Sequence, residues 1–375
     1  MPPTPYTPTP AELATLRAAL DDDPSIHARL ARSGEAGLEA GGWDDATLTR
    51  WLVAEAGDVK AAAARLASHA AWRADLLPDG WTAAKGEMGR GEEEGVREEE
   101  RGASLAAAAC ARARAQPFSQ STSPPRTPPH AHTHMHTITE ALIAPELVLG
   151  KTFASPPAIS PGSGGLARPL LLSLSARHFR SHRSPPAVGE LSLVYTMDAV
   201  ATAAAAAAKD RTGDGRVVSV VDMRGTGLAN LDSATSKAVV ALAQAAYPER
   251  LAATVIFGAP AIFGAVWSLL ARLLAPASLG KVFFLNSGED WSKVPGVDGA
   301  LIPACLGGGG GGPPAMPIQT FARAVGLGPA GGVVVGLSAG VPAVAGDPMM
   351  TGGVGGNNGD KARAGGGFAI PARAV

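Results

Sequence analysis

Three short runs of apolar residues, separated by helical patterns, place the strongest limit on how this chain can fold. The runs are RVVSVVD at 216–222, ATVIF at 253–257 and KVFFL at 281–285. Strands built from continuous Val, Ile, Leu and Phe are buried on both faces. Helices between such strands act as crossovers in a parallel sheet. The pattern therefore predicts an α/β fold with a mostly parallel sheet flanked by helices.

Further elements follow from the same kind of pattern. RPLLLS at 168–173 predicts another strand, and helices are predicted at 191–208, 233–246 and 261–274. The longest apolar stretch, residues 199–208, is rich in alanine and too short to span a bilayer. We therefore expect a cytoplasmic protein that contacts membranes only peripherally.

Composition separates the remaining segments. After an N-terminal extension at 1–43, apolar residues at helical spacing predict a small helical module at 44–85, with Asp44 suited to a helix N-terminus. Residues 86–137 are of low complexity and cannot bury enough apolar area to offset their ordering entropy, so we expect a disordered insert. The α/β domain is assigned to 138–308, and a Gly-rich flexible tail to 309–375.

Charge and cysteine content exclude several function classes. Lys and Arg number 32 and Asp and Glu 33, so the net charge of −1 creates no field that would favour nucleic acid. Cys110 and Cys305 show neither metal-ligand spacing nor a disulfide framework. HAHTHMH at 130–136 reflects biased composition, and we predict no metal site.

One motif suggests an enzyme. GLSAG at 336–340 fits the pattern G-x-S-x-G, which would make Ser338 the nucleophile of a serine hydrolase. In that fold an acid and then a histidine follow the serine along the chain, yet all eight histidines lie at or before His182. A chance match in a Gly-rich segment is the preferred explanation.

Two stretches resemble the CRAL-TRIO family, which includes the retinaldehyde-binding and tocopherol-transfer proteins and the fungal phosphatidylinositol/phosphatidylcholine transfer proteins. The longer stretch holds, in order, VVSVVDMRG, LANLD, YPERL at 247–251, VIFGAPAIFGAVWSLLARLLAP and GKVFFL. The shorter stretch, DDATLTRWL with SHAAWR, is similar to the helical module that precedes the domain in many members. The resemblance covers residues 44–81 and about 140–308.

The resemblance implies a sheet that forms the floor of a hydrophobic lipid cavity and a gate helix, 261–274, that closes over it. The local sequence agrees, because this helix is apolar over more than one stripe and must be buried or cover another apolar object. Plain core packing would explain the same pattern. The residues expected in the gate and cavity are Ile262, Phe263, Val266, Trp267, Leu270 and Leu273.

The resemblance also implies a headgroup site, because Glu249, Ser278 and Lys281 match the family's phosphoinositide-binding positions. Lys281 can offer a positive charge to a phosphate, and Glu249 can accept hydrogen bonds from inositol hydroxyls. Arg250 is a fourth candidate, which could instead pair with Glu249 or bind neighbouring carbonyls. A structural salt bridge is the alternative explanation for these charges.

Relatives that bind phosphatidylcholine tend to carry hydroxyl side chains where this chain has Gly227 and Ala229, which disfavours that lipid. We therefore expect a monomeric carrier of one phospholipid or other hydrophobic lipid, and a phosphatidylinositol-like lipid is the leading candidate. We expect transient membrane contact, no covalent reaction and no cofactor besides the lipid. Two alternatives remain: a degenerate CRAL-TRIO scaffold that binds a protein partner, and the Ser338 hydrolase.

Overall fold

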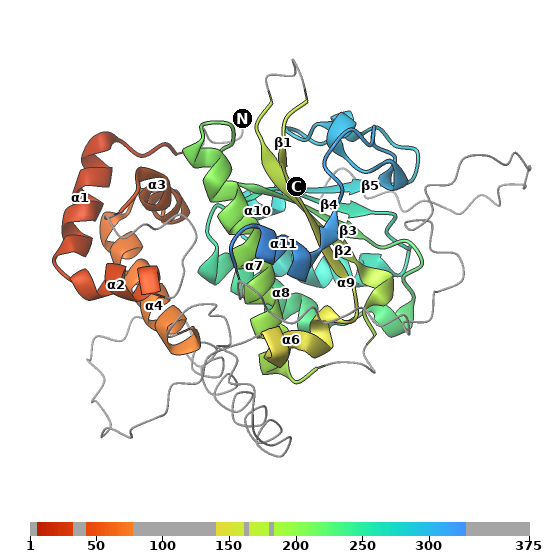
Figure 1. Cartoon of the computed structure of the whole chain (residues 1–375), viewed down its shortest axis with the longest axis horizontal. Coiled ribbons are helices and arrows are strands. Elements are labelled where there is room, and N and C mark those ends of the chain that lie inside the picture. Colours follow the sequence, from red (N-terminus) through yellow and green to blue (C-terminus); the bar gives the residue numbers. More distant parts are fainter. Residues whose placement is uncertain (1–5, 33–42, 78–139, 161–164, 180–183, 328–375) are drawn as a thin grey trace, which may run out of the picture. The chain divides into compact units, whose positions relative to one another are not determined.

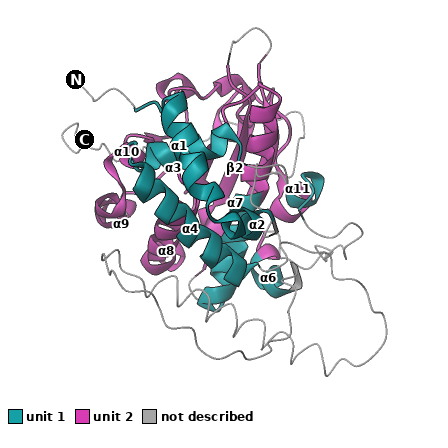
Figure 2. Cartoon of the chain, turned by 90° about the vertical axis from the view of Figure 1, so that its left-hand side faces the viewer, with its two compact units in different colours: residues 1–146, 183–198, 322–332 teal, residues 147–182, 199–321, 333–375 magenta. Residues whose placement is uncertain are grey.

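The computed structural model describes residues 6–32, 43–77, 140–160, 165–179 and 184–327, which fall into two compact units (Figures 1 and 2). The predicted insert at 86–137, the histidine-rich run and Ser338 lie outside these residues. The first unit comprises residues 1–146, 183–198 and 322–332, and the second comprises the remainder.

The first unit contains four helices that share one apolar core. They are α1 (Pro10–Asp21), α2 (Pro24–Arg32), α3 (Asp45–Ala54) and α4 (Val59–Leu76). Asp44 caps α3 as predicted, its carboxylate accepting the Thr47 N–H at 2.7 Å. Leucines of α1 and α2 join the same buried cluster as Trp51 and Leu66. This corrects the predicted boundary at residue 44, because α1 and α2, assigned to an extension, belong to the helical module.

A buried ion pair holds the first unit together over a long sequence separation. Arg73 in α4 donates two hydrogen bonds, of 3.0 and 2.7 Å, to the carboxylate of Asp198, and both side chains are almost fully buried. Asp198 lies in α7 (Pro186–Lys209), which starts in the first unit and ends in the second. Paired charges of this kind satisfy one another where water is excluded.

Helix α7 is longer than the predicted 191–208. Within the described residues it is the one helix that is long and apolar enough to cross a membrane, with 24 residues and a mean hydropathy of 1.4 over its most apolar window. That window is 61% buried inside the protein. Such burial is typical of a helix packed in a folded core.

The second unit is built on a six-stranded sheet with the order β5-β4-β3-β2-β1-β6, of which Figure 1 labels β1 to β5. Strands β2 (Arg168–Leu174), β3 (Val217–Asp222), β4 (Leu251–Phe257) and β5 (Val282–Leu285) are parallel, which confirms the predicted α/β class. Strand β1 (Thr152–Ala158) pairs antiparallel with β2 and with β6 (Met316–Pro317). Strand β1 was not predicted because it contains two prolines, and its register shifts where they lie, between Ser155 and Ala158.

Alternate residues of the parallel strands pack against different partners on the two faces of the sheet. On one face, residues such as Val220 and Val255 pack against Trp291 and Ile302 of the segment after β5. On the other face, Ile256 and Phe284 pack against the helix that follows β4. Other helices and short helical turns of the described residues are α6 (Glu140–Leu147), η1 (Ser175–Arg177), η3 (Leu228–Asn230), α8 (Ser233–Ala246), η5 (Trp291–Lys293), η6 (Gly299–Leu301), η7 (Ala304–Leu306) and α11 (Ile318–Ala324).

The glycine run at 307–312 is a packed part of the second unit. The N–H groups of Gly309 and Gly311 donate hydrogen bonds to the carbonyls of Gly299 and Ala300, both at 2.9 Å. A Cβ on Gly308 would lie 2.4 Å from the carbonyl oxygen of Ile302. The predicted boundary at 309 is therefore corrected, because this run packs on η6, and β6 and α11 follow it.

Candidate functional site

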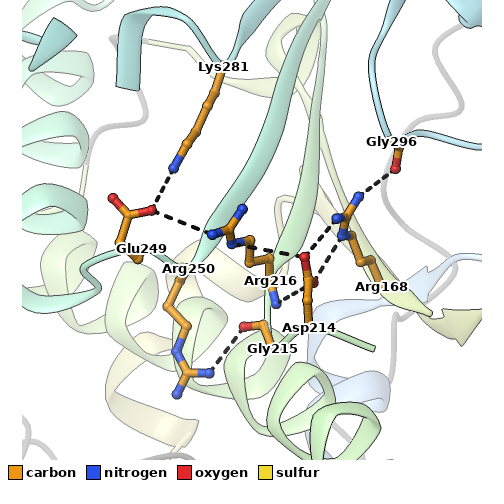
Figure 3. Close-up of polar contacts among 8 residues, drawn as sticks. All are labelled: Arg168, Asp214, Gly215, Arg216, Glu249, Arg250, Lys281 and Gly296. Atoms are coloured by element: carbon orange, nitrogen blue, oxygen red, sulfur yellow. Dashed lines mark hydrogen bonds and ion pairs between the residues drawn. The ribbon is translucent and has the colours of Figure 1, made fainter. Parts of the chain in front are cut away.

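Charged residues gather where the parallel strands of the second unit begin (Figure 3). Arg168 is the first residue of β2, Arg216 directly precedes β3, and Lys281 directly precedes β5. Glu249 and Arg250 precede β4 in the same way. Because parallel strands start at the same edge of a sheet, these side chains meet. With Asp214, they form what we call the charged cluster: Arg168, Asp214, Arg216, Glu249, Arg250 and Lys281.

The structure brings together two of the residues that the sequence analysis singled out. Nζ of Lys281 lies 2.8 Å from Oε2 of Glu249, and each side chain is about one-fifth exposed, at 21% and 19%. Arg216 contributes a second cation, with Nη2 at 4.0 Å from the same Oε2. Two positive groups thus converge on one carboxylate oxygen (Figure 3).

Glu249 occupies an unusual backbone conformation. Its φ is 54°, in the left-handed region that residues with a side chain rarely adopt. The turn is held by the Arg250 carbonyl, which accepts the Val217 N–H at 2.8 Å and so ties the end of the turn to β3. A conformation of this kind costs about 1–3 kcal/mol and is enriched at functional sites.

Asp214 organises the other half of the charged cluster. Its carboxylate accepts hydrogen bonds from Nε and Nη2 of Arg168 at 3.0 and 2.7 Å and lies 4.0 Å from Nε of Arg216. Burial alone would raise the pKa of Asp214, but the hydrogen bonds and charge of Arg168, followed by those of Arg216, outweigh it and lower the pKa below its ordinary value. Asp214 is therefore ionised at neutral pH.

The other two predicted headgroup residues take different positions. Arg250 is 3% exposed, and its guanidinium donates to the carbonyl oxygen of Gly215 at 3.2 Å. That contact matches the alternative role considered for it, binding a neighbouring carbonyl. Ser278 lies in α10 (Pro276–Leu279), where its carbonyl accepts the Lys281 N–H at 3.1 Å. It therefore helps to fix the backbone just before Lys281.

The predicted gate helix is shorter than 261–274. It consists of α9 (Phe263–Leu270) followed by the 3-10 turn η4 (Ala271–Leu273). One side of α9 packs on the sheet through Phe263, Val266 and Trp267, which contact the cluster around Ile256. Leu270 is also buried. The spacing of these four residues is that of a single helical face.

A neighbouring side of the gate helix presents large apolar residues to solvent. Ile262, Leu269 and Leu273 are 38%, 38% and 44% exposed. Two predicted cavity residues, Ile262 and Leu273, thus lie on the outer side of the helix. An apolar strip on a surface helix is a feature of sites that contact membranes or other proteins.

An open pocket of about 900 Å³ lies elsewhere in the second unit. Its lining includes Ile159, Leu166 and Arg168 near the β1–β2 connection, and Val297 and Leu301 of the segment after β5. Residues of α9 are not among those that line it. The hydrophobic lipid cavity expected beneath the gate helix therefore stays a prediction.

Arg168, Asp214 and Arg216 were not predicted as members of the charged cluster. A usable signal was present, because Arg216 and Lys281 occupy the same position relative to the apolar runs that became β3 and β5. Asp214 gives no such signal, since it lies in the turn before β3 and reaches Arg168 across 46 residues of sequence. The candidate site is the charged cluster, with four cations and two carboxylates and hence a formal net charge of +2.

A comparison with models of known protein families agrees with this architecture. The family model described as "CRAL/TRIO domain" matches residues 157–308, which ends where the predicted domain ends. Among solved structures, the chain is similar to one titled "Crystal structure of Sfh5", at 14% sequence identity, over 79% of this chain and 82% of that chain, with a TM-score of 0.38. The family match, on a mostly parallel sheet flanked by helices, shows that this chain contains a CRAL/TRIO domain, a module that typically binds and transfers lipids, at residues 157–308.

Proposed function

We propose that this protein binds one phosphatidylinositol-like lipid and transfers it between membranes, without catalysing a covalent reaction. The domain supports a lipid-binding role in general. The observation that carries the choice of lipid is the contact of Lys281 with Glu249 at 2.8 Å. These residues precede two neighbouring strands, β4 and β5, and they occupy the positions that the resemblance links to inositol lipids.

The charges suit a phosphoinositide headgroup. A phosphodiester can replace Glu249 as the ion-pair partner of the Lys281 ammonium. The Glu249 carboxylate can then accept hydrogen bonds from inositol hydroxyls. The formal charge of +2 favours an anionic headgroup over a neutral one. Gly227 and Ala229, which lack hydroxyls, give phosphatidylcholine no hydrogen-bond donor from their side chains.

The gate helix supports transfer at a membrane. Burying a methylene is worth about 0.8 kcal/mol, so a carrier must offer an acyl chain an apolar environment comparable to that of the bilayer. In the proposed cycle, Phe263, Val266 and Trp267 leave the sheet to admit the lipid. The exposed Ile262, Leu269 and Leu273 meet the membrane at that step. The proposal thus describes a cytoplasmic protein that contacts membranes peripherally.

Identifying the lipid that co-purifies with the protein tests this proposal. We expect native mass spectrometry to show one bound lipid per chain, and organic extraction to yield an inositol phospholipid. Transfer of labelled phosphatidylinositol between vesicles should then exceed transfer of phosphatidylcholine. A protein that stays empty after incubation with inositol lipids would instead favour the scaffold role.

A further inference from the structure

We propose that Arg216 is a specificity residue that makes this site favour inositol lipids carrying a phosphomonoester on the ring over unphosphorylated phosphatidylinositol. This inference rests on the proposed function and concerns the same site. No role was assigned to Arg216 by the sequence patterns, and it is singled out by its contacts in the charged cluster.

Arg216 is the cation of the charged cluster that is held least tightly. Its two ion pairs, to Asp214 and to Glu249, are both 4.0 Å long. By comparison, Arg168 contacts Asp214 at 2.7 Å and Lys281 contacts Glu249 at 2.8 Å. In the part of the chain that the structure describes, the guanidinium of Arg216 makes no side-chain hydrogen bond within normal range. Its N–H groups can therefore donate hydrogen bonds to a ligand without the loss of a short contact within the protein.

The side chain of Arg216 is also the most accessible of those measured in the cluster. It is 41% exposed, whereas Arg168 and Lys281 are 12% and 21% exposed. Arg250 is buried against the Gly215 carbonyl. A ligand that reaches this edge of the sheet from solvent can thus contact Arg216 without first displacing another chain segment.

Arg216 lies beside the groups proposed to bind the lipid phosphodiester. Its Nη2 and the Nζ of Lys281 approach the same Oε2 of Glu249 (Figure 3). When the phosphodiester binds Lys281, a second phosphate on the inositol ring can bind the guanidinium of Arg216. A planar guanidinium with five donors is well suited to bind phosphate oxygens in pairs.

The charge balance favours the same ligand. The cluster carries a formal net charge of +2, and a phosphodiester supplies only one negative charge. A phosphomonoester adds about −1.5 to −2 charges at pH 7. Phosphatidylinositol leaves one positive charge of the cluster unbalanced, and the phosphomonoester supplies the negative charge that pairs with it. Arg168, which is fixed by Asp214 and by the Gly296 carbonyl, holds the neighbouring carboxylate in place.

Competitive uptake from vesicles tests the inference. Phosphatidylcholine vesicles containing equal small amounts of phosphatidylinositol and a phosphatidylinositol monophosphate are incubated with the protein, and the bound lipids are counted by native mass spectrometry. We expect the wild-type protein to favour the monophosphate, and Arg216→Gln to lower the monophosphate-to-phosphatidylinositol ratio about tenfold, as for the loss of one charge-assisted contact. Arg29→Gln, the same change on the exposed face of α2, is the matched control and should leave the ratio unchanged.

Other outcomes separate failure of the Arg216 inference from failure of the proposed function. If wild-type protein takes up phosphatidylinositol without favouring the monophosphate, or if Arg216→Gln leaves the ratio unchanged, the inference on Arg216 is wrong and the proposed function stands. If wild-type protein takes up neither inositol lipid, the proposed function itself fails. Soluble inositol bisphosphate is added as a competitor in a separate arm. At the same concentration as the lipid, this competitor should leave most of the monophosphate uptake in place, because the free headgroup has no acyl chains to bury. Complete loss of uptake at that concentration would show that the site prefers the free headgroup to the membrane lipid, which overturns the inference.

Discussion

The indole of Trp267 in α9 packs edge-on against the ring of Phe284 in β5, with ring centroids 5.1 Å apart and an interplanar angle of 78°. This pair joins the proposed gate helix to the sheet that it covers. An edge-to-face pair contributes about 0.5–1.5 kcal/mol beyond its buried area. The contact therefore stabilises the closed position of α9.

Trp267→Leu tests whether α9 moves during lipid exchange. The substitution keeps an apolar side chain but removes the edge-to-face contact, so opening should become easier. We expect lipid transfer between vesicles to become about three- to tenfold faster, from the free energy of one aromatic pair. Val239→Ala on α8, another half-exposed apolar site, should leave the transfer rate unchanged. A transfer rate equal to that of the wild-type protein would show that opening of α9 does not limit exchange.

Lys281→Ala tests the headgroup site. Loss of the ammonium should reduce transfer of phosphatidylinositol while transfer of a neutral lipid persists. The free energy of unfolding should fall by about 1 kcal/mol or less, because Arg216 still approaches Glu249. The control is Lys293→Ala, which removes a lysine paired with Glu289 at 2.7 Å on the surface. Equal losses for charged and neutral lipids, or a large drop in melting temperature, would mean that Lys281 has a structural role.

The parts of the fold that the sequence predicted are those with strong local patterns. Strands β3, β4 and β5 are continuous apolar runs, and α8 has the predicted bounds of 233–246, with Asp232 as its N-cap. Local patterns fail where the stabilising partner is distant in sequence. Strand β1 contains prolines and is held by its neighbours β2 and β6.

The residues of the candidate site also divide into those with a local sequence pattern and those held by a partner distant in sequence. Glu249 and Lys281 were found by their positions in a family pattern, whereas Asp214 pairs with Arg168 only because two strands lie in a particular register. Strand register depends on the buried faces of both strands and on the connection between them, so neither segment alone determines it. The glycine run was misjudged for a related reason, since glycine composition suggests flexibility unless a second backbone packs closely on it.

Gly308→Ala tests the packing of the glycine run. The added Cβ would meet the Ile302 carbonyl oxygen at 2.4 Å and the Gly299 carbonyl oxygen at 2.8 Å, and backbone atoms cannot rotate away. Overpacking of this kind costs about 1–3 kcal/mol, so thermal unfolding should shift to a lower temperature. Gly189→Ala in α7, where nothing lies within 4 Å of the added Cβ, should cause no loss. Equal melting temperatures for the two variants would show that residues 307–312 do not pack as described.

The ion pair of Asp214 with Arg168 predicts that the free energy of unfolding depends on pH in the acid range. Because folding lowers the pKa of Asp214 from its ordinary 3.8, the ionised carboxylate stabilises the fold fully above that pH, and this contribution is lost as pH falls through the lower folded value. Asp214→Asn should therefore reduce the free energy of unfolding at neutral pH, and its difference from the wild-type protein should shrink as pH falls below about 4. Urea unfolding at several pH values measures this difference. In an Arg168→Gln background the effect of Asp214→Asn should be smaller at neutral pH, because the main source of the low pKa is gone. If the free-energy difference between Asp214→Asn and the wild-type protein stayed constant with pH, the pair would not stabilise the fold.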